Sequence, residues 1–203
     1  MTREYGHLNN VIYEVYNEPV NQSWNEVKGY AEQVIAAIRA EDPDNLIVVG
    51  TPKWSQNVDD ASRNQINGKN IAYVLHFYAG THKGELRAKA QTALNNGAAL
   101  FATEWGTVNA NGDGGVNHGE TDAWMQFFKQ NNISHAGWAL NDKAEGSSVF
   151  KCNNVNQFKD CEDPIDNKWS MLTESGSKQK DIYNNWPRPS GIKNGTGGTV
   201  SGG

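Results

Sequence analysis

Five short apolar runs are spaced along the chain. They cover residues 11–16, 46–50, 71–77, 98–103 and 135–140. Each run is nearly continuous rather than alternating with polar residues, as in LIVVG and IAYVLHF. Such runs are typical of parallel strands that are buried on both faces of a sheet.

Segments with apolar residues at helical spacing separate these runs. They cover residues 24–40, 83–95, 120–131 and about 175–184. Ser23 is placed to cap the first helix, Pro43 prevents its continuation, and Gly97 marks the end of the second. The alternation of strand and helix predicts an α/β fold built of βα units around a parallel sheet.

The chain has 203 residues, enough for one sizeable core, and no break in composition suggests two domains. A (β/α)8 TIM barrel has eight strands and normally about 250 residues. If the five runs are strands of such a barrel, roughly three strands are missing before them, and the chain would be a partial barrel of about strands four to eight. We predict one truncated domain over residues 1–189 and a Gly/Ser/Thr-rich linker or tail over 190–203.

Composition narrows the classes of partner. The formal net charge of −5 argues against nucleic acid as the main partner. No apolar run approaches the length that spans a membrane, and the first residues do not resemble a signal peptide. The chain holds 7 Trp and 7 Tyr, whose flat rings serve a core and also stack on sugar faces.

Two cysteines, Cys152 and Cys161, lie in the polar segment KCNNVNQFKDC. They are either two free thiols or a disulfide that closes a short loop, and we favour the disulfide outside the cytosol. Zinc is not expected, because no further Cys or paired His completes a tetrahedral set.

Two glutamates occupy matching positions after apolar runs: Glu18 in VYNEP and Glu104 in FATEWG. Loops after parallel strands gather at one end of the sheet, where active sites form. Two carboxyl groups brought together there are the equipment of glycoside hydrolysis, in which one protonates the leaving oxygen and the other attacks the sugar or activates water. The alternative is two unrelated surface glutamates.

Four motifs in order give the sequence a family resemblance: VIYEVYNEP, LHFYAGTH, ALFATEWGT and GWALNDKAEGSS. From about residue 5 to about residue 186 the chain resembles the C-terminal part of a glycoside hydrolase family 5 cellulase. The resemblance implies a secreted, retaining endo-β-1,4-glucanase that acts on cellulose or cello-oligosaccharides without a cofactor or metal.

The resemblance also implies residue roles. Glu18 would be the acid/base and Glu104 the nucleophile, while Asn17 would bond the 2-hydroxyl of the reacting sugar. His76 and Tyr78 would orient the nucleophile and the sugar beside it. Hydrogen bonds from these two side chains are expected to favour the ionised form of Glu104.

Further cleft residues are predicted less directly. Trp138 would form a stacking floor, and Trp54 either stacks on a sugar or packs within the protein. Lys143 and Glu145 resemble residues that bond sugar hydroxyls in related cellulases, the alternative being exposed loop charges. The segment NANGDGGVNHGE matches most of a calcium-loop pattern, but a strand rather than a helix precedes it, so we expect no calcium there.

Half a barrel would expose strand edges and the apolar residues of the barrel interior. We therefore expect the chain to form a homo-oligomer. There are two alternatives to an active cellulase: an inactive or sugar-binding fragment, and a mannanase or xylanase on the same scaffold.

Overall fold

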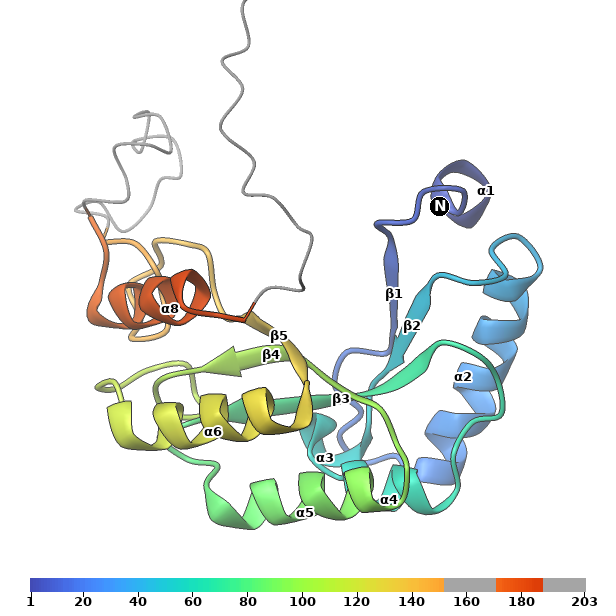
Figure 1. The fold of residues 1–203 in the computed structure, drawn as a ribbon, viewed down its shortest axis with the longest axis horizontal. Helices are drawn as coiled ribbons and strands as arrows, with labels where there is room; N and C mark the ends of the chain where they lie inside the picture. Colours follow the sequence, from blue (N-terminus) through green and yellow to red (C-terminus); the bar gives the residue numbers. More distant parts are fainter. Residues whose placement is uncertain (152–170, 188–203) are drawn as a thin grey trace, which may run out of the picture.

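The computed structural model describes residues 1–151 and 171–187. Five parallel strands form one sheet in which spatial order follows chain order (Figure 1). They are β1 (Ile12–Val15), β2 (Leu46–Val49), β3 (Ile71–Tyr78), β4 (Leu100–Gly106) and β5 (Ser134–Gly137). All five predicted strands are present, and the fold class is confirmed as a partial (β/α)8 barrel.

The described helices include all four predicted from the sequence. They are α1 (Thr2–Tyr5), α2 (Trp24–Arg39), α3 (Pro52–Ser55), α4 (Val58–Arg63), α5 (Gly84–Asn95), α6 (His118–Asn131) and α8 (Glu174–Asn184). Ser23 caps α2 as predicted, and its side chain and that of Glu26 bond each other's backbone N–H in a capping box. The short helices α3 and α4, which have no strong apolar period, were not predicted.

The outer face of the sheet, which we define as the side covered by helices, carries most of the core. Figure 1 shows α2, α5 and α6 along this side. Phe77 of β3 stacks between Trp105 of β4 and Trp124 of α6, with ring centroids 5.8 and 4.2 Å away. Phe128 closes the same aromatic group edge-on. Burial of these large rings fixes the helices on the sheet.

The inner face, which we define as the side turned to the barrel interior, carries smaller apolar side chains. Val48, Ala72 and Val74 form a separate buried cluster there, with Leu46 and Phe101 packed against it. Successive residues of a strand point to opposite faces, so the residues between the outer-face aromatics of β3 face inward. His76 and Tyr78 belong to this inward set.

A bulge in β4 interrupts this alternation. Val74 pairs with Phe101, but the next pair joins His76 to Glu104, so β4 has one extra residue between the two pairs. The extra residue lets both Thr103 and Glu104 reach the inner face before Trp105 returns to the outer face. The predicted strand ended at residue 103. In the structure β4 continues through Glu104, because pairing with β3 persists to Gly106.

Three predictions fall outside the described residues: the Cys152–Cys161 disulfide and the tail over 190–203 lie there, as does the boundary near 189 between domain and tail. Among the described helices, none has the length and apolar character needed to cross a membrane.

Candidate active site

The turn after β1 presents Glu18. Tyr16 takes a left-handed conformation with φ of 65°, and the chain there passes directly over Gly50 at the end of β2. A Cβ at Gly50 would lie 1.7 Å from the carbonyl oxygen of Tyr16, so only glycine permits this approach. The turn is also tied to the segment after β2, where Ser55 Oγ donates to the carbonyl of Asn17 over 2.8 Å.

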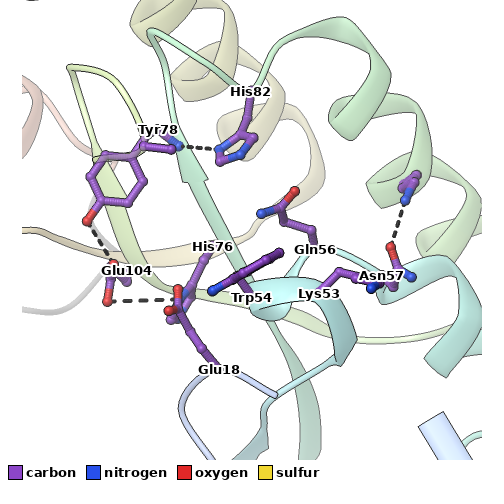
Figure 2. A pocket seen from close by; sticks show the side chains of 11 residues that line it. Glu18, Lys53, Trp54, Gln56, Asn57, His76, Tyr78, His82 and Glu104 are labelled. Atoms are coloured by element: carbon purple, nitrogen blue, oxygen red, sulfur yellow. Dashed lines mark hydrogen bonds and ion pairs between the residues drawn. The ribbon is translucent and has the colours of Figure 1, made fainter. Parts of the chain in front are cut away.

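His76 links the two glutamates. Its ring is almost fully buried on the inner face of β3. Nδ1 lies 2.7 Å from Glu18 Oε1 and 3.9 Å from Glu104 Oε2, and Nε2 lies 2.9 Å from Thr103 Oγ1. The structure therefore brings together the two predicted catalytic glutamates and the histidine predicted to orient the nucleophile (Figure 2).

Tyr78 orients the second carboxyl group. Its hydroxyl donates to Glu104 Oε1 over 2.8 Å, as Figure 2 shows. Gly106, which pairs with Tyr78 across the two strands, leaves room for the ring, because a Cβ there would lie 2.4 Å from a ring carbon. Burial raises the pKa of Tyr78, and the bond to Glu104 adds to the effect, so the phenol keeps its proton and acts as a donor.

Two opposing groups of effects act on the pKa of Glu104. Burial raises the pKa of Glu104, and the charges of Glu18 and Glu14 act in the same direction. The hydrogen bond from Tyr78 and the charge of His76 lower this pKa but do not outweigh burial. The predicted effect of Tyr78 and His76, which is to favour the ionised form of Glu104, is therefore present, and burial opposes it.

An open pocket of about 620 Å³ surrounds the pair. Besides Glu18, His76, Tyr78 and Glu104, its walls include Lys53, Trp54, Gln56, Asn57, His82, Lys89 and Ala110. Trp54 is 47% exposed and stands beside Glu18 and His76 in Figure 2, so of its two predicted positions it occupies the cleft. Residues 53–55 are held in left-handed conformations, a strained backbone of the kind that concentrates at functional sites.

The remaining predicted cleft residues lie farther out. Trp138 follows β5 and is 45% exposed, but it is not among the residues that line this pocket. Lys143 and Glu145 form an ion pair of 2.6 Å, with the lysine exposed and the glutamate largely buried. Glu145 is close enough to raise the pKa of Tyr78, though less than burial and the two nearer glutamates do.

Sequence reasoning missed His82, Thr103 and Glu14. His82 Nδ1 accepts the backbone N–H of Tyr78 over 2.9 Å, which fixes its ring in the pocket wall. Burial lowers the pKa of His82, which keeps this acceptor neutral. Two signals were available in the sequence: a hydroxyl residue directly before Glu104, and an acidic residue in the middle of the apolar run VIYEV.

Glu18, His76 and Glu104 lie close enough together to hold a metal ion. Glu18, His76 and Glu104 each offer one ligand-type atom, and these atoms all lie within 4.8 Å of one another. A divalent cation bound between them would have two carboxylate oxygens and one imidazole nitrogen as ligands. Hydrogen bonding among the three residues, Tyr78 and Thr103 accounts for their positions without an ion.

Comparison with known proteins agrees with this site. The sequence model described as cellulase, glycosyl hydrolase family 5, matches residues 1–144. Endoglucanase Z of Dickeya dadantii is 61% identical over 192 residues, which cover 94% of this chain and 42% of the relative. An endoglucanase of Clostridium saccharobutylicum is 50% identical over 153 residues, covering 74% of this chain and 34% of the relative.

Solved structures show the same fold. The catalytic domain of alkaline cellulase K superposes with a TM-score of 0.81 at 33% identity, covering 90% of this chain and 61% of that one. A structure from Cytophaga hutchinsonii gives 0.80 at 44% identity, covering 91% and 59%. The chain thus spans less than half the length of these curated relatives and about three fifths of these solved chains. The family match and these relatives confirm the resemblance seen in the motifs: the chain belongs to glycoside hydrolase family 5, the cellulases.

Proposed function

We propose that this chain carries the catalytic pair of a retaining endo-β-1,4-glucanase. The observation that carries the proposal is the close approach of Glu18 and Glu104, whose oxygens lie within 4.8 Å of each other and of His76 Nδ1. Retaining glycosidases hold their carboxyl groups about 5–5.5 Å apart, whereas inverting enzymes separate them by about 6.5–9.5 Å to admit a water. The short separation supports double displacement.

In this mechanism Glu104 attacks the anomeric carbon as the glycosidic bond breaks, and Glu18 gives its proton to the leaving oxygen. A covalent glycosyl ester forms on Glu104. Glu18, now ionised, takes a proton from water while the water oxygen attacks the anomeric carbon and releases Glu104. Tyr78, which bonds Glu104 Oε1, holds that carboxyl group in place through both steps.

The substrate proposed is an internal β-1,4-glucosidic bond of cellulose or a cello-oligosaccharide, because the relatives are named endoglucanases. Trp54, exposed beside the pair, would stack on a sugar ring on one side of the bond. Asn17, Trp138 and the Lys143–Glu145 pair are proposed to contact the remaining sugars. The parent protein is proposed to act outside the cell, where its polymeric substrate is found.

Two measurements test the proposal. The chain should release reducing sugar from carboxymethylcellulose, the Glu104→Gln variant should not, and Glu32→Gln, a change on the exposed side of α2, should behave as the wild type. A dinitrophenyl cellobioside with fluorine in place of the hydroxyl next to the anomeric carbon should release dinitrophenol and leave its sugar on Glu104, as read by peptide mass spectrometry. Equal background rates for the chain and Glu104→Gln, with no label, would refute catalysis by this chain.

A second proposal concerns assembly. β1 and β5 are the edge strands of the sheet, and Ile12 and Tyr16 at the β1 edge are 51% and 39% exposed. Unpaired edges beside exposed apolar side chains favour pairing with another copy. We propose that the chain forms a homo-oligomer, and a single monomeric mass in light scattering at micromolar concentration would refute this. An oligomer that binds cellulose without hydrolysing it would support the sugar-binding alternative.

The third candidate, a mannanase or xylanase, shares the same catalytic pair. Product analysis on β-linked glucan, mannan and xylan separates it from a glucanase. Preference for glucan is expected.

A further inference from the structure

The inner face carries a chain of hydrogen bonds that begins outside the pocket. Glu14, in the middle of β1, accepts from Thr103 Oγ1 over 3.0 Å. Thr103 in turn contacts His76 Nε2 over 2.9 Å, and His76 Nδ1 contacts Glu18 over 2.7 Å. Glu14 and Thr103 are 89 residues apart and belong to β1 and β4, so the curvature of the sheet brings them together across the barrel interior.

Which group donates and which accepts in each of these hydrogen bonds follows from counting protons. An ionised carboxylate can only accept, so the single hydroxyl proton of Thr103 points to Glu14. The Thr103 oxygen is then free to accept, which requires a proton on His76 Nε2. A neutral imidazole that donates from Nε2 has a bare Nδ1, so Glu18 must supply the proton that lies between the two. The only other arrangement with the same protons is an imidazolium facing an ionised Glu18.

We propose that Glu14 is a positioning residue that keeps a proton available to Glu18 by fixing the tautomer of His76 through Thr103. This inference rests on the proposed function, in which Glu18 is the acid. Without an acceptor at position 14, Thr103 can donate to His76 Nε2. His76 then carries its proton on Nδ1 and donates to an ionised Glu18, which has no proton to give.

The placement of Glu14 supports this role. It is paired in register with Val48, and Ile12, two residues earlier in β1, lies on the same strand face. Glu14 is exposed at this edge of the sheet, so the hydrogen bond from Thr103, rather than burial, holds its carboxylate in place. The other charged or titratable groups that line the pocket around the Glu18–His76 pair are Tyr78 of β3, Glu104 of β4, His82 after β3, Lys53 in α3 and Lys89 in α5. Glu145 after β5 acts on Tyr78.

The decisive experiment reads the tautomer of His76 directly. Long-range nitrogen NMR of the histidine rings in the full chain should show a protonated Nε2 at His76 near neutral pH. In Glu14→Leu, which leaves no acceptor for Thr103 at this position, His76 should move toward the Nδ1-protonated tautomer. Thr103→Ser, which keeps the hydroxyl, should retain the wild-type tautomer, and so should the exposed control Glu32→Gln.

A bare Nε2 in the wild type would overturn the proposal, and so would an unchanged tautomer in folded Glu14→Leu. Should Glu14→Leu fail to fold, Thr103→Val serves instead, because it removes the same link and should shift His76 toward the Nδ1-protonated tautomer. These readouts need no turnover, so failure of this inference is distinct from failure of the proposed hydrolysis.

Kinetics give the second readout. Glu14→Leu should slow hydrolysis of cello-oligosaccharides, which need a proton on the leaving oxygen, at least about tenfold. It should leave nearly unchanged the cleavage of a dinitrophenyl cellobioside, whose leaving group needs no proton. A merely structural role for Glu14 would lower both rates equally and would contradict the proposal. The effects of Glu14→Leu and Thr103→Val should not add in the double variant, because both break the same series of hydrogen bonds.

Discussion

The two faces of the sheet differ in the size and the chemistry of their side chains. On the outer face, strand and helix side chains are large and aromatic, and Phe77, Trp105 and Trp124 are fully buried against one another. On the inner face, the apolar residues are small, as Ala72 and Val74 are, and they lie beside a network of ionisable groups.

This difference separates stability from chemistry along single strands. In β3, alternate residues pack against helices while His76 and Tyr78 hold the two glutamates. Changes on the outer face should therefore act on the free energy of unfolding, and changes on the inner face on the rate of hydrolysis. Four substitutions test this separation, beginning with the largest expected effect.

Trp124→Ala should remove the centre of the outer aromatic group and lower the free energy of unfolding by about 3–5 kcal/mol, since large buried aromatics leave a cavity. Urea unfolding followed by circular dichroism measures this loss. Phe127→Ala, a change at a partly buried ring on the same helix, is the control and should cost clearly less. Equal losses for both variants would mean that the outer core is not centred on Trp124.

Glu18→Gln should leave the free energy of unfolding nearly unchanged, while slowing hydrolysis of cello-oligosaccharides by about 10²–10⁴-fold. The physical reason is that a glutamine fills the same space but has no proton to donate. Rates on a cellobioside with an activated leaving group should fall far less in the bond-breaking step. If Glu18→Gln unfolds at lower urea and its hydrolysis rate is unchanged, the inner face would serve stability rather than hydrolysis.

His135 gives the outer face a pH dependence. Burial, with a smaller effect of Lys129, lowers its pKa to about 4, and its Nδ1 accepts from Trp105 Nε1 over 3.0 Å. The unfolded chain takes up the proton near pH 6.5, whereas the folded protein resists it down to about pH 4, so stability falls as pH drops through this window.

Allowing for the partial exposure of His135, the loss should reach about 2 kcal/mol. Urea midpoints measured from neutral pH to pH 4 test it against His135→Gln, which keeps an acceptor for Trp105 and cannot titrate. The urea midpoint of His135→Gln should therefore fall less steeply than that of the wild type as the pH is lowered. Identical slopes would show that other groups dominate acid unfolding.

Ser23→Ala should have the smallest effect, a loss of about 1 kcal/mol in the free energy of unfolding, because it removes the cap of α2 from the outer layer. Glu26→Gln preserves the other half of the capping box and should cost less. Thermal unfolding resolves the two. If either variant changes the hydrolysis rate by more than its loss of folded protein explains, the assignment of stability to the outer face and chemistry to the inner face is contradicted.

The sequence alone determined the strands, the main helices and the pair Glu18 and Glu104. Continuous apolar runs mark strands buried on both sides, and parallel strands bring their ends together, so residues after two such runs become neighbours without any knowledge of packing. Helix α2 was equally readable, because its cap and its apolar stripe are local features.

The tertiary structure decided what depends on register and on distance. Only pairing with β3 places the bulge in β4 that turns both Thr103 and Glu104 inward. The contact between Glu14 and Thr103 requires the curvature of the whole sheet, and no local pattern encodes it. The raised pKa of Glu104 likewise follows from the depth of its burial among other carboxylates, a quantity that exists only once the chain has folded.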